Sequence, residues 1–208
     1  MYYEIIEIYS AVQGEGVNAG IPMVVVRLRG CNLRCLWCDT KYAWPDAGVG
    51  SKSMDEESIA VEVQKFPGIQ WVMLTGGEPT AQNLYLLCSA LHDVGKDIAL
   101  ETNGTLPISG RVDWICISPK LGVPGGDRIN IPALLEVDEL KFVIGDQHDI
   151  DLVNQFLVDH LHHLLRGHVQ ICLQPQSQDV EATKLCYEEC IKKGWRLSVQ
   201  LHKLIGIR

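Results

Sequence analysis

The chain has 208 residues, of which 47% are hydrophobic and 21% are charged, and this composition excludes a disordered or fibrous protein. The formal net charge of -8 at pH 7 argues against direct binding of nucleic acid phosphates, because such binding needs clustered Lys and Arg. No apolar run reaches the roughly 18 residues of a membrane span, and residues 1–4 lack the basic character of a secretory signal. We therefore expect one cytoplasmic domain over residues 1–208, with no membrane partner.

Short apolar runs rich in Val, Ile and Leu predict buried parallel strands, and segments with helical spacing lie between them. The predicted strands are residues 23–28, 71–75, 98–101, 114–118, 140–144 and 169–174, with a seventh at 197–201 closing the edge. The predicted helices are residues 54–66, 83–94, 148–165 and 180–193, and residues 121–132 are expected to form a surface loop. A complete eight-fold barrel needs about 250 residues, so this α/β alternation predicts a partial TIM-type barrel of six or so parallel strands with helices outside.

Three cysteines, Cys31, Cys35 and Cys38, follow the first of these predicted strands within a single short loop. Their thiolates can converge on one small group without distant chain contacts. Soft thiolates select zinc or iron-sulfur clusters, and a four-iron cluster held by three Cys leaves one iron open to a cofactor. We therefore predict a [4Fe-4S] cluster whose open iron is chelated by S-adenosylmethionine.

The alternative for this loop is a structural zinc site, which normally needs a fourth protein ligand. No fourth Cys or His lies nearby in the sequence, although a ligand could arrive from a distant segment. The other five cysteines sit in apolar stretches and are expected to be buried small hydrophobic residues: Cys88, Cys116, Cys172, Cys186 and Cys190.

Residues 75–79, Thr-Gly-Gly-Glu-Pro, follow the second predicted strand. The two glycines permit close backbone approach, and Glu78 can accept a hydrogen bond from a bound ammonium group. Alone, this run would be an ordinary loop. Downstream of the cysteine loop, it resembles the motif by which radical S-adenosylmethionine enzymes hold the amino group of their cofactor. Ligands of parallel sheets sit beyond the carboxyl ends of the strands, so we expect both motifs on one rim.

Further motifs extend over essentially the whole chain, and in this order they resemble the 7-carboxy-7-deazaguanine synthases, which are radical S-adenosylmethionine enzymes of the queuosine pathway. The motifs are Gln13-Gly14-Glu15-Gly16, Arg27, Gly30-Cys31, Trp37-Cys38-Asp39-Thr40, residues 75–79, Glu101-Thr102-Asn103-Gly104, Ser118-Pro119-Lys120, Gln174-Pro175 and Gln200-Leu201-His202-Lys203. The resemblance implies that 6-carboxy-5,6,7,8-tetrahydropterin becomes 7-carboxy-7-deazaguanine with loss of ammonia, by way of a 5′-deoxyadenosyl radical. It also implies Mg²⁺ as a cofactor, a reducing partner such as flavodoxin or ferredoxin, and a homodimer.

The resemblance also implies roles for individual residues. It assigns contacts with S-adenosylmethionine to Gly77, Glu78, Glu101, Asn103, Ser118, Pro119, Lys120, Gln174, Pro175, Gln176 and Ser177. It assigns contacts with the substrate to Val12, Gln13, Gly14, Glu15, Arg27, Thr75, His202 and Arg208, and a magnesium ligand to Thr40.

Some of these roles have a physical reason beside the resemblance. The planar fork of Arg27 matches a carboxylate such as that of the pterin, the alternative being a surface ion pair. Gln13 and Glu15 can offer the acceptors and donors that a pterin edge requires, or can be loop residues that face water. Lys120 can also be a solvated charge, and Thr40 a plain turn residue.

Two other functions fit part of the sequence. The cysteine spacing also suits an activase that installs a glycyl radical on a partner protein, but the motifs around Gln13, Arg27 and His202 would then have no task. An electron-carrier or zinc-binding module is the alternative outside catalysis, and three ligands count against it. The run containing His160, His162 and His163 is expected to be a solvated cationic helix end rather than a metal site.

Overall fold

The computed structural model describes residues 1–164 and 169–206, and the strands of this part form one sheet in the order β3-β1-β2-β4-β5-β6-β7-β8-β9. From β2 to β9 every neighbouring pair is parallel, whereas β1 pairs antiparallel with β2 and with β3. The sheet is open, because its edge strands β3 and β9 are not paired with each other in the described residues. The strands are β1 (Tyr2–Val12), β2 (Pro22–Leu28), β3 (Lys52–Asp55), β4 (Trp71–Gly76), β5 (Asp97–Thr102), β6 (Trp114–Ile117), β7 (Glu139–Ile144), β8 (Gln170–Pro175) and β9 (Arg196–Leu197).

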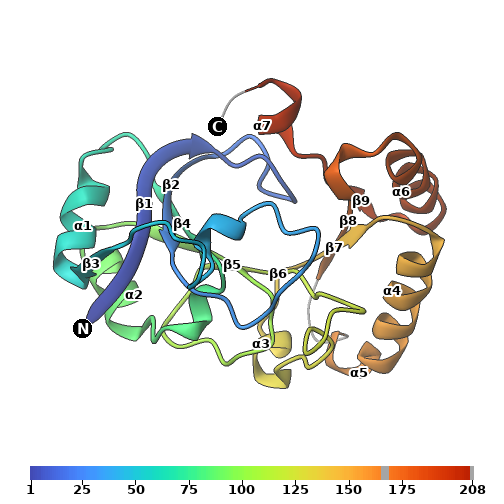
Figure 1. Ribbon diagram of the computed structural model, residues 1–208, viewed down its shortest axis with the longest axis horizontal. Helices are drawn as coiled ribbons and strands as arrows, with labels where there is room; N and C mark the ends of the chain where they lie inside the picture. The colour runs from blue at the N-terminus through green and yellow to red at the C-terminus, as the bar shows by residue number, and fades with distance from the viewer. Residues whose placement is uncertain (165–168, 207–208) are drawn as a thin grey trace.

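Helices flank this sheet, with α1 and α2 at its β1 end and α4 and α6 at its β9 end (Figure 1). They are α1 (Glu56–Gln64), α2 (Tyr85–Asp93), α3 (Ile131–Leu135), α4 (Gln147–Asp159), α5 (Leu161–Leu164), α6 (Val180–Lys193) and α7 (Leu201–Leu204). Carboxylates begin three of them: Asp55 accepts the amide of Ser58 at α1, Asp179 accepts that of Ala182 at α6, and Asp146 forms a capping box at α4. No helix in the described residues has the length and apolar content needed to cross a membrane.

The six apolar runs predicted as parallel strands are confirmed as β2, β4, β5, β6, β7 and β8. The seventh predicted strand does close the edge, as β9 beside β8, but its extent is wrong: β9 covers only Arg196–Leu197, and α7 begins at Leu201. The sequence prediction also missed β1 and β3. β3 is the edge strand and β1 is its neighbour. β1 alternates buried and exposed residues at its start, and neither strand forms the continuous apolar run of a strand covered on both faces.

The helices at 54–66, 83–94 and 180–193 are confirmed as α1, α2 and α6, within three residues at each end. The predicted helix at 148–165 is partly wrong, because α4 ends at Asp159 and α5 follows as a separate element, while residue 165 lies outside the described residues. The loop predicted at 121–132 ends early, since Asn130 caps α3 by accepting the amide of Ala133.

Two apolar clusters form the core. One lies between β1, β2, β4, β5 and the helices α1 and α2, and the other between β6, β7, β8 and the helices α3, α4 and α6. The five cysteines outside the cysteine loop are all buried, as predicted. The parallel strands are thereby fixed with their carboxyl ends at one rim, and the polar motifs of the sequence follow these ends.

Candidate active site

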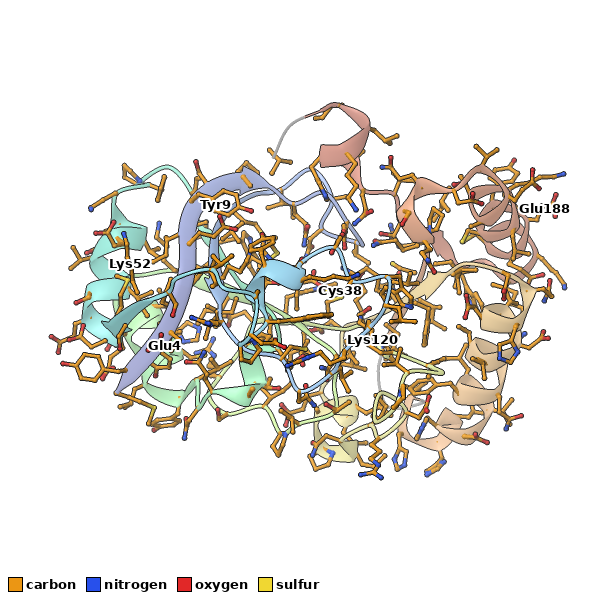
Figure 2. All side chains as sticks on the ribbon, in the orientation of Figure 1. Glu4, Tyr9, Cys38, Lys52, Lys120 and Glu188 are labelled. Atoms are coloured by element: carbon orange, nitrogen blue, oxygen red, sulfur yellow. The ribbon has the colours of Figure 1, made fainter. Side chains whose placement is uncertain are left out.

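A cavity of about 410 Å³ opens at the carboxyl ends of the parallel strands. Figure 2 shows Cys38 and Lys120, two of its lining residues, in the middle of the view over the strand ends. The predicted site residues that line it are Val12, Gln13, Gly14, Glu15, Arg27, Cys31, Cys35, Cys38, Thr40, Thr75, Gly77, Glu78, Glu101, Asn103, Ser118, Lys120, Gln174, Pro175, Gln176, Ser177 and His202. Motifs spread over the whole chain therefore meet in one space.

The cysteine loop rests on the Gly-Gly-Glu-Pro turn through backbone contacts. The amide of Glu78 donates to the carbonyl of Gly30 at 2.6 Å, and the amide of Gly77 donates to that of Leu28 at 3.1 Å. A Cβ atom on Gly77 would lie 2.1 Å from the oxygen of Gly30 and 3.0 Å from the Cβ of Cys31. Glycine at this position is therefore required for the turn to approach the loop.

Cys31, Cys35 and Cys38 all line the cavity, and no other cysteine among the described residues does so. The amides of Leu33 and Thr40 donate to the sulfurs of Cys31 and Cys38, both at 3.4 Å, and such bonds tune iron-sulfur centres. No three His, Cys, Asp or Glu side chains in the described residues converge on a single metal ion. Three sulfurs that are open to a cavity suit a cluster with one open corner better than a closed zinc site.

Glu78 lies at the inner wall of the cavity with 1% of its surface exposed. One carboxylate oxygen accepts bonds from the amide and hydroxyl of Thr80 and from the hydroxyl of Thr102 at 2.6 Å. The other oxygen accepts the amide of Asn103 at 2.7 Å. A carboxylate offers about four lone-pair sites, so this second oxygen keeps capacity for one further donor.

Lys120 also lines the cavity, on the segment after β6. Its ammonium donates to the carbonyl of Ser118 at 2.7 Å and to the Ser118 hydroxyl at 2.6 Å, and it lies 5.7 Å from the ring centre of Trp37. Burial lowers the pKa of Lys120. Lys120 is therefore part of the cavity wall and not a solvated charge.

Two carboxylates of the cavity meet at one buried lysine. Glu15 and Glu101 both pair with Lys141 of β7, at 2.8 Å and 2.9 Å. Burial alone would raise the pKa of Glu15, but the Lys141 ammonium and the amide of Gln200 outweigh it and lower this pKa to about 2. Glu15 is therefore an ionised carboxylate that accepts hydrogen bonds within the cavity.

Arg27 of β2 also lines the cavity and is already paired within the protein. Its guanidinium donates to Glu7 at 2.8 Å and to the hydroxyl of Tyr9 at 3.3 Å, and it lies 5.8 Å from the ring centre of Tyr42. The Arg27 side chain is only 13% exposed. The alternative considered from the sequence was an ion pair of Arg27 at the surface. Arg27 does form an ion pair, with Glu7, but this pair is largely buried and Arg27 lines the cavity.

Comparisons with known proteins agree with this geometry. Residues 25–148 match the model of the radical SAM superfamily. The chain is 33% identical to the 7-carboxy-7-deazaguanine synthase of Escherichia coli (strain K12) over 225 aligned positions and 38% identical to that of Bacteroides thetaiotaomicron over 210, with all of each chain covered. The chain belongs to the 7-carboxy-7-deazaguanine synthase family. The crystal structure of QueE from Escherichia coli superposes with a TM-score of 0.86 at 32% identity, covering 97% of this chain and 95% of that one.

Residues near the C-terminus of this family member complete the cavity wall. The imidazole of His202 lies against Gly14, where a Cβ atom would be 2.4 Å from its Nδ1. Lys203 and Gln200 both donate to Asp39, and Asp39 also accepts the Thr40 hydroxyl at 3.1 Å. Thr40 is therefore held in place by a carboxylate next to the cysteine loop.

Two residues of this synthase-family chain, Pro119 and His160, lie elsewhere than the sequence predicted. Pro119 lines a separate cavity of about 340 Å³, which shares Trp37 and Gln176 with the first. The predicted substrate contact of Arg208 stays a prediction, because Arg208 lies outside the described residues. His160 is not a solvated cation, because it packs 4.6 Å from the ring of Phe156 and burial lowers its pKa.

Two further residues, Lys141 and Gln200, line the cavity but were not predicted as site residues from the sequence. A signal was present for Lys141, because a lysine inside the apolar run of β7 needs a buried partner. For Gln200 the resemblance gave a motif position but no role. Only the fold brings Gln200 within 2.7 Å of Glu15, 185 residues away in the sequence.

Proposed function

We propose that this chain, acting as one domain over residues 1–208, converts 6-carboxy-5,6,7,8-tetrahydropterin to 7-carboxy-7-deazaguanine with loss of ammonia. One observation carries the proposal: the three loop cysteines and the carboxylate-rich end of the cavity line the same space of about 410 Å³. A cavity of this size suits small molecules, and its polar groups come from several segments. Membership of the 7-carboxy-7-deazaguanine synthase family supports the same reaction.

Cys31, Cys35 and Cys38 would hold a [4Fe-4S] cluster, which fits the sulfurs open to the cavity and their amide donors. When bound, the cluster and S-adenosylmethionine supply reductive cleavage of a sulfonium and hence hydrogen-atom abstraction. Glu78, with a free acceptor position on a buried carboxylate, would bind the ammonium group of S-adenosylmethionine.

Other groups around the cavity would bind the rest of S-adenosylmethionine through hydrogen bonds. Ser177 adopts a left-handed φ of 53°, and such sparsely populated conformations cluster at ligand sites. We assign this role to Gly77, Glu101, Asn103, Ser118, Lys120, Gln174, Pro175, Gln176 and Ser177, and to Pro119 only through the neighbouring cavity.

The substrate would bind at the β1 end. Arg27 would pair with the pterin carboxylate, with Glu7 holding the guanidinium in orientation. Gln13 and Glu15 would meet the donors of the heterocycle, because a carboxylate and an amide together accept and donate along one edge. The remaining substrate contacts are assigned to Val12, Gly14, Thr75, His202 and Arg208.

Thr40 would supply one ligand to Mg²⁺, which commonly takes few protein ligands and keeps several waters. The hydrogen bond from Thr40 to Asp39 supports this role, since a carboxylate beside the ligand can orient the shell. A flavodoxin or ferredoxin would supply electrons, a homodimer would be the working form, and the cytoplasm its compartment.

Anaerobic reconstitution tests the proposal. Iron and sulfide content should fit one cluster, and incubation with reductant, S-adenosylmethionine and the carboxylated tetrahydropterin should release ammonia and form the deazapurine. Cys35→Ala should abolish cluster and product, whereas Cys88→Ala, at a cysteine buried in α2, should keep both. A colourless zinc protein, or a cluster-loaded protein that leaves the pterin unchanged, would contradict the proposed function.

Arg27 can be tested against an arginine outside the cavity. Arg27→Ala should raise KM for the pterin by about one to two orders of magnitude, since charge-assisted bonds contribute about 1.5 to 3 kcal/mol each. Arg111→Ala is the matched control, because Arg111 is 79% exposed and pairs only with Asp113 among the described ion pairs. Equal KM values for the two variants would show that Arg27 does not bind the pterin.

A further inference from the structure

Lys141 is a buried cation on β7 between two carboxylates of the cavity. We propose that Lys141 is a positioning residue: its ammonium holds the carboxylates of Glu15 and Glu101 in a fixed orientation, so that Glu15 meets an N–H donor of the pterin while Glu101 faces S-adenosylmethionine. This inference rests on the proposed function. It assigns a role to Lys141 that neither its sequence motif nor the family resemblance indicates.

The geometry around Lys141 is that of a branched network. The Lys141 side chain is 5% exposed, and its ammonium lies 2.8 Å from one oxygen of Glu15 and 2.9 Å from one oxygen of Glu101. The second oxygen of each carboxylate accepts an amide, from Gln200 at 2.7 Å for Glu15 and from Gln13 at 3.0 Å for Glu101. Five side chains from four chain segments are thus joined through one ammonium group, and all of them line the cavity.

A positive charge at this point is needed because the two carboxylates share one low-dielectric site. Like charges in such a site raise the pKa of one of them, so a proton would be taken up if Lys141 were neutral or absent. With Lys141 present the opposite holds for Glu15, whose pKa is lowered to about 2. An ionised carboxylate only accepts hydrogen bonds, whereas a protonated one also donates and would oppose an N–H of the substrate.

Among the titratable groups around the network, Lys141 is the cation that pairs directly with Glu15 and Glu101. Burial raises the pKa of the Cys116 and Cys172 thiols and of the Glu139 carboxyl, which favours their neutral forms. The charged and titratable groups that face the network are Glu139 on β7, Cys116 on β6, Cys172 on β8, Lys120 after β6 and Asp39 in the cysteine loop.

The decisive comparison removes the charge but keeps hydrogen-bond donors. In reconstituted, cluster-loaded protein, Lys141→Gln should keep iron and sulfide content. It should raise both KM and the calorimetric Kd for the pterin by about tenfold, with a smaller change in kcat. The acidic limb of kcat/KM should move to higher pH, because one carboxylate now takes up a proton. Lys141→Arg, which can bridge two carboxylates, should restore most of the affinity and the wild-type pH profile.

Lys96→Gln is the matched control. Lys96 is also buried, 8% exposed, but its ammonium donates to the main-chain carbonyls of Phe66 and Ile69, away from the cavity. This variant should lower stability while leaving KM and the pH profile unchanged. A Lys141→Gln variant that matches Lys96→Gln in these two measurements would overturn the inference, as would a loss of cluster in proportion to the loss of turnover.

The pH profile of the unaltered protein gives a further test that does not depend on a variant at Lys141. With Lys141 in place, wild-type kcat/KM should show no acidic limb from Glu15 down to about pH 6. A wild-type limb near neutrality that disappears in Glu15→Gln would overturn the inference. A different result would contradict the proposed function itself: wild-type protein that cleaves S-adenosylmethionine but releases no ammonia from the pterin.

Discussion

Lys203 and Asp39 are 164 residues apart in the chain, and their side chains form an ion pair of 2.9 Å. Gln200 donates to the same Asp39 oxygen at 3.0 Å, and the amide of Leu201 donates to the carbonyl of Gly14 at 2.9 Å. Residues 200–206, here called the C-terminal segment, therefore contact both the cysteine loop, at Asp39, and the loop of residues 13–16 that is predicted to bind the substrate. Figure 1 shows α7 of this segment on the same side of the molecule as the end of β1.

Replacing Lys203 should loosen this segment. The ion pair is partly exposed, 36% and 54% at its two side chains, so its contribution is about 0 to 1 kcal/mol and Lys203→Met should raise KM for the pterin by no more than about fivefold. Because salt screens exposed pairs, the KM of the wild type should rise more steeply with ionic strength than that of Lys203→Met. Lys192→Met, which breaks the ion pair with Glu189 on α6, should leave KM unchanged in the same titration.

Gly14→Ala should disturb the substrate end without harming the cluster. The new methyl group would lie 2.4 Å from Nδ1 of His202, so the imidazole must move away from the cavity wall. We expect a higher KM for the pterin, unchanged iron content, and a stability loss of less than about 1 kcal/mol, since a side chain rather than backbone gives way. Gly50→Ala is the control, because nothing lies within 4 Å of its Cβ position. Wild-type KM in Gly14→Ala would show that His202 does not contribute to binding.

Gly77→Ala should act on the cysteine loop instead. Its methyl group would lie 2.1 Å from the carbonyl oxygen of Gly30, and backbone cannot yield as a side chain does. The expected results are a stability loss of about 1 to 3 kcal/mol in urea denaturation and a lower iron content after reconstitution. Gly68→Ala, with open space at its Cβ position, should match the wild type in both measurements. Full cluster loading of Gly77→Ala would contradict the backbone contact as the support of the loop.

The lowered pKa of Glu15 predicts how stability depends on pH. With a folded-state pKa of about 2, below its ordinary value, Glu15 stabilises the fold above about pH 4.5, and this stabilisation is lost as the pH falls toward 2. A shift of this size corresponds to about 3 kcal/mol. Urea unfolding of the metal-free protein should therefore show Glu15→Gln well below the wild type at pH 7, with the gap closing toward pH 2.

Glu188→Gln provides the matched control for this pH series. Glu188 is exposed on α6, at the edge of the molecule and away from Lys120 of the cavity (Figure 2), and its replacement should change stability little at any pH. A constant gap between Glu15→Gln and the wild type across the whole range would contradict the lowered pKa of Glu15.

The sequence predicted those parts of the fold that have a local signal. Parallel strands buried on both faces are continuous apolar runs, so β2, β4, β5, β6, β7 and β8 were found. β1 was missed because it is an antiparallel strand at the margin of the sheet, with a register shift between Ile5 and Glu7 that interrupts its alternation. The run at 197–201 was apolar enough to predict a strand, but the chain turns away after Leu197 to reach the cavity.

For the site, the sequence by itself determined the identity of the cluster ligands, because Cys31, Cys35 and Cys38 are close in the chain and their spacing carries the chemistry. Only the tertiary structure decided how the charged groups pair. Arg27 with Glu7, Lys141 with Glu15 and Glu101, and Lys203 with Asp39 are contacts between distant segments. The physical reason is that an ion pair depends on distance in space and on the surrounding dielectric, and neither is encoded by neighbours along the chain.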